Sequence, residues 1–188
     1  MFQAILIAGF GGQGVLSTGQ LLAYAGMVEK RHVAWIPSYG PEMRGGTANC
    51  GVTISSSPIS SPVVSEPTVL IAMNRPSLEK FEPTVVKGGI IFVNSSLIDI
   101  KSTREDLRVY YVPANDMAED LGNGKVANNI ILGALIELTG VVTPGAVEKS
   151  LQDVLPPHHH KMIPLNLKAL ETGADLVRSN GSGAGGQS

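Results

Sequence analysis

Residues 4–14 read AILIAGFGGQG, an apolar run that passes directly into a cluster of glycines. The run has the composition of a buried β-strand, and residues 15–27 after it place apolar side chains at helical intervals. A glycine turn between a strand and a helix predicts an anion site. Glycines let backbone N–H groups approach an anion closely, and a helix start adds unpaired donors and the positive end of its dipole. Phosphate is the anion that such a turn favours.

Gly9, Gly11 and Gly14 match the GxGxxG fingerprint of dinucleotide-binding folds. A nicotinamide or flavin cofactor also needs an acidic residue at the end of the next strand, where it holds the ribose hydroxyls. The next expected strand covers residues 32–36, and residues 37–39 after it contain no carboxylate. Two interpretations therefore stay open: a phosphate site, or glycines that only permit tight packing of a helix on a strand.

Composition limits the function classes. The chain has 188 residues, of which 43% are hydrophobic, and a net charge of −2, so we expect one domain with one core. The charges are scattered without a basic stripe, which argues against nucleic-acid binding. Apolar runs are shorter than a membrane span needs and no basic signal sequence opens the chain, so we expect a cytoplasmic location. Cys50 is the single cysteine, which excludes the usual multi-thiolate zinc or iron–sulfur site and indicates a buried, inert thiol.

Residues 37–46, with the sequence PSYGPEMRGG, are predicted to form an unusual loop. Prolines and glycines restrict its backbone around side chains that carry functional groups. The loop follows a strand beside the glycine turn, where open α/β sheets bind ligands. Arg44 offers a planar guanidinium suited to a phosphate or carboxylate, although a surface ion pair with Glu42 explains it equally well.

Further elements follow in order. Residues 47–54 and 63–64 are predicted to form a hairpin arm, and buried strands over 68–73, 89–94 and 107–112 come after it. Helices are predicted over 76–81, 116–121, 126–138, 144–155 and 165–177, and a polar turn over His158–His160. Asn74 and Asn94 close two successive strands, so each either faces a ligand or caps the structure that follows.

Four separated blocks, GFGGQG, SYGPEMRGGTANC, IAMNRPSLEKF and IIFVNSSLI, resemble the gamma subunit of 2-oxoacid:ferredoxin oxidoreductases, most closely the 2-oxoglutarate type. The similarity spans residues 1 to about 178. It implies an α/β fold, a three-layer Rossmann-like sandwich with a mostly parallel sheet and a β-hairpin arm. It also implies a single gamma-subunit domain over residues 1–178. The remaining residues, 179–188, have almost nothing apolar to bury, so we expect them to form a flexible tail.

The resemblance further implies a module that joins alpha and beta subunits, and in some complexes a delta subunit. Thiamine diphosphate, Mg and iron–sulfur clusters are then expected only on those partners, and this chain is expected to hold no catalytic residue and no metal. The complex would decarboxylate 2-oxoglutarate oxidatively with coenzyme A and pass electrons to ferredoxin or a similar acceptor. Consistent with this, the chain has neither a GDG…NN thiamine pattern nor a CxxC motif.

Carried onto this chain, the resemblance places the coenzyme A phosphates near Gly11, Gly12, Gln13 and Gly14, and it turns the loop from Ser38 to Thr47 toward partner subunits. The complete set of candidate binding residues is Gly11, Gly12, Gln13, Gly14, Ser38, Tyr39, Arg44, Gly45, Gly46, Thr47 and Asn74. A homodimer is also compatible with the sequence. Two other hypotheses stay open: a stand-alone dinucleotide-dependent dehydrogenase and a purely structural scaffold subunit.

Overall fold

A computed structural model describes residues 1–39 and 46–181. The strands are β1 Phe2–Phe10, β2 His32–Tyr39, β3 Thr47–Ser55, β4 Val69–Ala72, β5 Ile90–Asn94 and β6 Arg108–Val112. The α-helices are α1 Val15–Val28, α2 Arg75–Phe81, α3 Ala114–Asp120, α4 Ala127–Thr139, α5 Pro144–Val154 and α6 Ile163–Gly181. Short 3-10 helices cover Glu82–Thr84, Gly124–Val126 and Pro157–Met162. Most predicted elements are therefore confirmed to within two residues. The second strand is longer than predicted: residues 37–39, predicted to begin a loop, belong to β2 and pair with β3.

The described strands form one sheet in the order β2-β3-β1-β4-β5-β6. The pairs β1–β4, β4–β5 and β5–β6 are parallel, whereas β3 is antiparallel to both of its neighbours, β1 and β2. Of the strands in the described residues, only β3 runs against the common direction. The prediction of a mostly parallel sheet is confirmed.

The hairpin arm has a different partner strand from the predicted one. β3 pairs along its length with β2, with Ser38 opposite Asn49, and residues 56–68 contain no strand. Val63-Val64 is too short a run to build a ladder, and the prolines around it cannot donate ladder hydrogen bonds. As a result β3 lies beside β1, in the place where a dinucleotide-binding fold has its second parallel strand.

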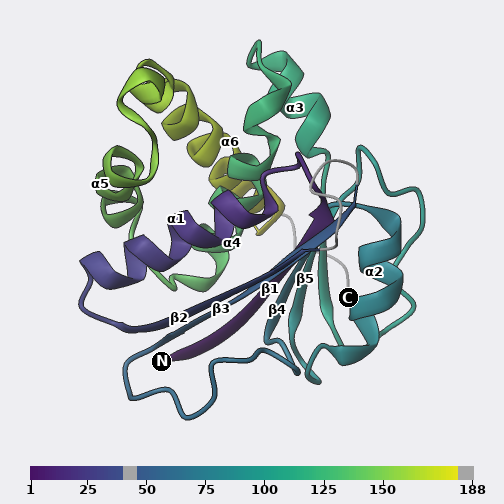
Figure 1. Cartoon of the computed structure of the whole chain (residues 1–188). Coiled ribbons are helices and arrows are strands. Elements are labelled where there is room, and N and C mark those ends of the chain that lie inside the picture. The colour runs from purple at the N-terminus through teal and green to yellow at the C-terminus, as the bar shows by residue number, and fades with distance from the viewer. Residues whose placement is uncertain (40–45, 182–188) are drawn as a thin grey trace.

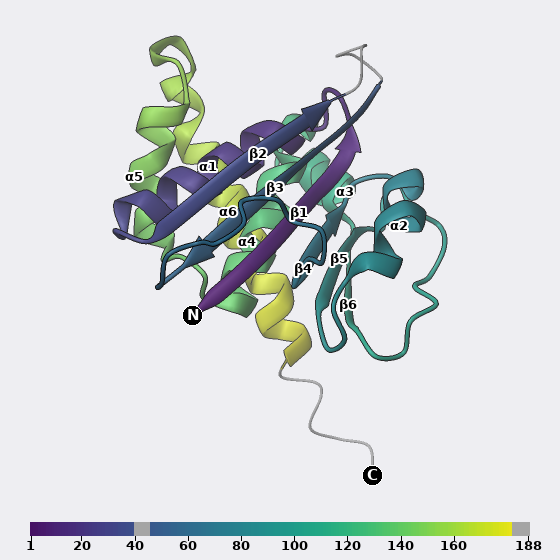
Figure 2. The ribbon, with the colours of Figure 1, turned by 60° about the horizontal axis from the view of Figure 1, so that its bottom comes forward.

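Helices cover the sheet unequally. Figures 1 and 2 show α1, α3, α4, α5 and α6 on one face and α2 on the other. The two faces have separate cores, the larger under α1 and α4 and the smaller between α2 and the strands β4 and β5. Because the helices that follow β1 and β4 leave toward opposite faces, the carboxyl ends of these two strands form the topological switch point where open sheets bind ligands.

α4 and α6 approach each other closely through two glycines. A Cβ built on Gly133 would lie 2.6 Å from the carbonyl carbon of Leu170, and one on Gly173 would lie 2.7 Å from the carbonyl carbon of Ile130. Backbone atoms therefore occupy the space that a side chain at either position would need. This crossing is the tightest constraint that we find on the helical layer.

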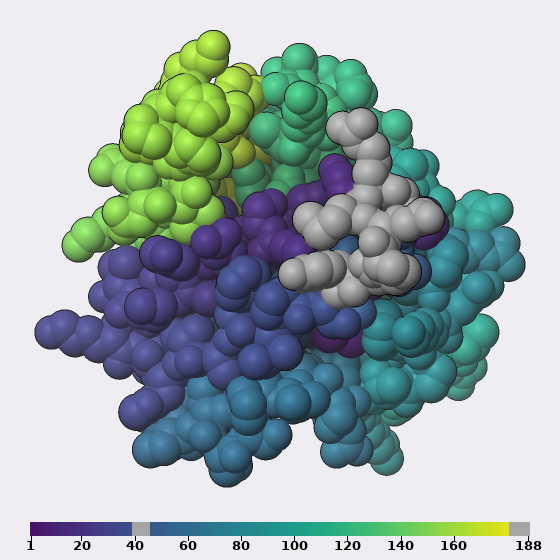
Figure 3. Space-filling view, in the orientation of Figure 1, coloured from purple at the N-terminus to yellow at the C-terminus, as the bar shows by residue number. Residues whose placement is uncertain are grey.

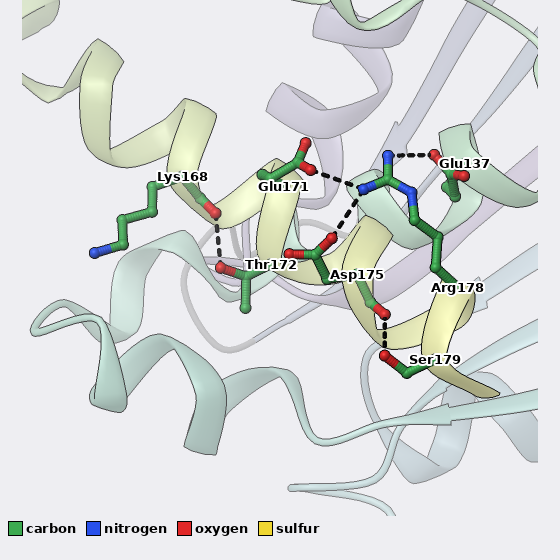
Figure 4. A network of polar contacts seen from close by, with 7 residues as sticks. All are labelled: Glu137, Lys168, Glu171, Thr172, Asp175, Arg178 and Ser179. Carbon is green, nitrogen blue, oxygen red and sulfur yellow. Dashed lines mark hydrogen bonds and ion pairs between the residues drawn. The ribbon is translucent and has the colours of Figure 1, made fainter. Parts of the chain in front are cut away.

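An ion-pair network also links α4 and α6 (Figure 4). Arg178 on α6 lies 2.8 Å from Glu137 on α4, and 2.8 Å from both Glu171 and Asp175 on its own helix. The guanidinium lowers the pKa of the Glu137 carboxyl below its usual value, chiefly through their hydrogen bond. All four side chains reach solvent, so the network contributes less to stability than the glycine contact.

Two predictions near the C-terminus need correction. α6 runs from Ile163 to Gly181, longer at both ends than the predicted 165–177. Ile163 packs against the larger core at the N-terminal end, and the C-terminal extension includes residues 179–181 of the predicted tail. The histidine triplet lies in the 3-10 helix Pro157–Met162 instead of a plain turn, and the His160 ring contacts Leu155 O through Nε2 at 2.8 Å.

Candidate functional site

The predicted glycine turn connects β1 to α1, which confirms the strand–turn–helix context. Gly12 has φ +93° and Gly14 has φ +76°, a left-handed conformation that glycine adopts without strain. Gly14 is the N-cap of α1 and provides no side-chain cap. The chain thus turns sharply and leaves the first amides of α1 uncapped.

Two N–H groups of the turn are used internally. Gly11 N donates to Gly46 O at 2.8 Å, and Gln13 N donates to Phe10 O at 3.2 Å. The first bond joins the glycine turn to Gly46, directly before β3, and the second closes the turn on itself. Neither amide is therefore available to an anion without breaking one of these bonds.

The other N–H groups of the turn are uncommitted as far as residues 1–39 and 46–181 are concerned. Within the described residues, no acceptor faces the amides of Gly12, Gly14 or the first α1 residues, Val15-Leu16-Ser17. The first turn of α1 carries no acidic side chain to compete with a bound anion. Unpaired donors at a helix start, reinforced by the dipole, form an anion site.

A depression of about 310 Å³ opens beside these donors, and we call it the first depression. It is lined by Phe10, Gly11, Gly12, Gly14, Val15, Leu16, Ser17 and Ala48. Figure 3 shows the start of α1, in purple, at the surface between green α3 and the blue strands β2 and β3. The uncommitted amides therefore border open volume on the surface of the protein.

A second depression, of about 280 Å³, lies on the other side of the turn. Its lining comprises Gly12, Gln13, Gly14, Met73, Asn115, Gly124, Lys125, Ala127 and Asn128. Lys125 contributes a positively charged side chain to this lining, near the carboxyl ends of β1 and β4. Asn115 is oriented by Asn94 Nδ2, which donates to its Oδ1 at 2.8 Å, and Asn128 donates to Thr18 Oγ1 at 2.9 Å.

Apart from Gln13, the polar residues of this second depression were not among the candidates predicted from the sequence. Residues 122–129 read GNGKVANN, a composition typical of a turn before a helix. Nothing in that pattern says that the start of α4 lies against a glycine turn more than a hundred residues earlier. Only the folded chain brings Lys125 beside Gly12.

The loop residues proposed as ligands divide into three groups. Gly46 and Thr47 lie at the glycine turn, since Gly46 O accepts from Gly11 N and Thr47 stands opposite Phe10 in the ladder. Ser38 is exposed near the end of β2, and Tyr39 is the last residue of that strand. Arg44 and Gly45 lie outside the described residues. Their roles, like those of the other candidate residues, remain predictions.

Asn74 is a helix cap. Its Oδ1 accepts from Ser77 N at 2.9 Å at the start of α2, and only 4% of the residue is exposed. The residue lines neither depression. Of the two interpretations drawn from the sequence, the geometry supports capping.

Within residues 1–39 and 46–181, no acidic side chain stands at the end of β2 or of β4, the two places where this sheet could present the acidic residue of dinucleotide-binding folds. β2, whose end lacks a carboxylate, is separated from β1 by β3. The parallel neighbour of β1 is β4, which ends at Ala72 and is followed by Met73 and Asn74, so no carboxylate stands there either. The topology thus weakens the dehydrogenase hypothesis further.

Cys50 has the environment of an inert thiol. It is fully buried and its Sγ donates to Val15 O at 3.4 Å. Burial raises the pKa of the Cys50 thiol to about 11, although contacts with the Trp35 side chain and the Gly19 backbone oppose the rise. The prediction of a buried cysteine is confirmed.

We expect Cys50 to resist maleimide in the native chain. At about pH 8 only roughly a thousandth of such a thiol is ionised, and buried thiols are shielded from reagents. Mass spectrometry after timed labelling should show one adduct in denaturant and almost none without it. Rapid stoichiometric labelling of the native chain would contradict the burial described above.

Among the helices of the described residues, none combines the length and apolar character that crossing a bilayer requires.

A sequence model of the family described as "Pyruvate ferredoxin/flavodoxin oxidoreductase" matches residues 4–176.

Two curated relatives show how the similarity is distributed. The chain is 46% identical over 179 residues to "Ketoisovalerate oxidoreductase subunit VorA" of Methanothermobacter marburgensis, a match that covers 94% of this chain and 37% of VorA. It is 32% identical over 181 residues to "2-oxoglutarate synthase subunit KorC" of Methanocaldococcus jannaschii, with 95% of each chain covered. The chain thus spans little more than a third of VorA but nearly all of KorC.

Solved structures agree with the sequence comparison. The gamma subunit of keto/oxoacid ferredoxin oxidoreductase from Geobacter sulfurreducens superposes with a TM-score of 0.78 at 30% identity, covering 92% of this chain and 96% of that one. The α/β fold class is therefore confirmed by comparison as well as by the sheet itself. The match over residues 4–176 and the agreement with gamma subunits lead to one conclusion: the chain belongs to the pyruvate ferredoxin/flavodoxin oxidoreductase family, as a gamma subunit.

Proposed function

We propose that this gamma subunit contributes a coenzyme A site and subunit contacts to a complex that oxidatively decarboxylates a 2-oxoacid. The observation that carries the proposal is the row of uncommitted amides at Gly12, Gly14 and the start of α1, which border the first depression. Coenzyme A presents phosphate groups, and phosphates bind where N–H donors and a helix dipole converge. No acidic side chain in the first turn of α1 opposes them.

Companion subunits complete the reaction in this proposal. Alpha and beta subunits, with or without a delta subunit, would carry thiamine diphosphate, Mg and iron–sulfur clusters and pass electrons to ferredoxin or a similar acceptor. Tyr39 ends β2, and Gly46, directly before β3, accepts from Gly11 N in the glycine turn, so one end of the sheet would serve both coenzyme A and a partner. The chain would be active only within this assembly.

The 2-oxoacid proposed here is 2-oxoglutarate, which follows the sequence blocks that resemble the 2-oxoglutarate type. A branched-chain 2-oxoacid, ketoisovalerate, is the second candidate, because identity to VorA, at 46%, exceeds identity to KorC, at 32%. The two candidates are separated by assaying the assembled complex with each acid. A clear preference for ketoisovalerate in kcat/KM would replace the first candidate by the second.

Photoaffinity labelling of the assembled complex tests the coenzyme A assignment directly. A photoreactive coenzyme A should label this chain in the peptides that contain residues 10–17 or 46–48, and unlabelled coenzyme A should compete. Labelling confined to the companion subunits would favour the scaffold hypothesis. Competition by NAD alone would instead revive the dehydrogenase hypothesis.

A further inference from the structure

The side chain of Gln13 continues the β1–β4 ladder where the two strands separate. In the regular part of the ladder, Ala8 stands opposite Ala72 and Met73 N donates to Ala8 O at 2.8 Å. The next bond of a parallel ladder would run from Phe10 N to Met73 O. Instead Phe10 N donates to Gln13 Oε1 at 2.6 Å, and Gln13 Nε2 donates to Met73 O at 3.2 Å.

The carboxamide of Gln13 therefore takes the place of one peptide group between the strands. It accepts where Met73 would have accepted and donates where Phe10 would have donated, so no backbone group loses its partner. Strands β1 and β4 can then separate at their carboxyl ends without leaving an unpaired donor or acceptor. This separation is located at the switch point between α1 and α2.

Gly9 makes the space for this carboxamide. A Cβ at position 9 would lie 2.5 Å from Gln13 Oε1 and 2.8 Å from Met73 Cβ. Any side chain there would displace Gln13 from between the strands. The first glycine of the fingerprint thus has a packing role, which is the second interpretation that the sequence left open.

We propose that Gln13 is a positioning residue, which anchors the glycine turn so that the amides of Gly12 and Gly14 point away from the sheet toward the bound anion. Gln13 does not line the first depression, and both ends of its carboxamide are occupied. Its backbone N–H is also used, by Phe10 O. The inference rests on the proposed coenzyme A function, but it assigns Gln13 a role different from ligand contact.

The first test is Gln13→Met in the assembled complex, because methionine keeps the length of the side chain and loses both hydrogen bonds. The KM for coenzyme A should rise about tenfold, as expected when one or two hydrogen bonds no longer hold the donors in place. The KM for the 2-oxoacid and kcat at saturating coenzyme A should stay within about twofold. An equal loss for both substrates would overturn the inference.

Gln13→Glu is a conservative variant that should recover coenzyme A binding when the new carboxyl group is protonated. The ionised carboxylate would accept from Phe10 N but would meet the Met73 carbonyl oxygen with no proton to donate. The protonated acid can make both bonds, as glutamine does. The KM for coenzyme A relative to wild type should therefore improve as the pH falls from about 8 to about 6. Absence of any such recovery, with the variant correctly assembled, would count against the inference.

Gly9→Ala distinguishes positioning from direct contact, because residue 9 lines neither depression. It should displace the carboxamide and reproduce the defect of Gln13→Met toward coenzyme A. In hydrogen exchange of the complex, both variants should lose protection at the Phe10 amide. A normal KM in Gly9→Ala together with lost protection would refute a positioning role.

Gly12→Ala separates failure of this inference from failure of the proposed function. If Gly12→Ala weakens coenzyme A binding and Gln13→Met does not, only the positioning role is overturned. If neither variant changes the KM for coenzyme A, the site itself has been misassigned and both proposals fail.

Discussion

Gly173→Ala is expected to destabilise the chain severely. The new Cβ would lie 2.7 Å from the carbonyl carbon of Ile130 and 3.0 Å from Ala134 N, both backbone atoms of α4. A flexible side chain could move aside, but a helix backbone can yield only if α4 and α6 separate. We expect a loss on the order of 3 kcal/mol or more in the free energy of unfolding.

Gly145→Ala is the matched control for this prediction. Gly145 also lies in a helix, α5, but a Cβ there would meet nothing within 4 Å. Alanine should be neutral or should stabilise the chain by up to about 1 kcal/mol, since it favours helix more than glycine does. Denaturant unfolding of both variants makes the comparison. Equal stability of the Gly173 and Gly145 variants would show that the helices cross with more room than described.

Gly12→Ala is expected to weaken coenzyme A binding selectively in the assembled complex. A Cβ at Gly12 meets no atom of residues 1–39 and 46–181 within 4 Å, so this part of the chain does not exclude a methyl group there. The φ of +93° does disfavour alanine, and the methyl would occupy space beside the amides that hold the phosphate. Loss of one or two charge-assisted hydrogen bonds, each worth roughly 1.5–3 kcal/mol, should raise the KM for coenzyme A about tenfold or more.

Gly88→Ala controls for the backbone strain in that experiment. Gly88 has φ +78° and equally open surroundings, but it precedes β5 at the opposite end of the sheet. Both variants should lose similar stability, while only Gly12→Ala should affect coenzyme A, and neither should change the KM for the 2-oxoacid. A parallel loss for both substrates, or failure of the Gly12 variant to assemble, would mean that the turn has only a structural role.

Local patterns in the sequence were sufficient to predict most elements and the glycine turn. The apolar run before Gly9 and the helical spacing after Gly14 depend on neighbours only a few residues apart, so sequence order alone reveals them. The same is true of Thr143 and Pro144, which begin α5 as a cap and a first-turn proline. The burial of Cys50 also followed from its apolar surroundings in the strand.

Strand order and site assembly depended on tertiary contacts. The sequence does not show that β3 inserts between β1 and β2, because antiparallel pairing joins residues across a loop and several registers look equally apolar. The sequence also does not show that Lys125 lies near the glycine turn. Nor does it show that positions 133 and 173 must lack a side chain for α4 and α6 to cross. Gln13 illustrates the difference: its sequence position suggested a ligand contact, whereas its two hydrogen bonds exist only because folding brings the end of β4 within reach of its carboxamide.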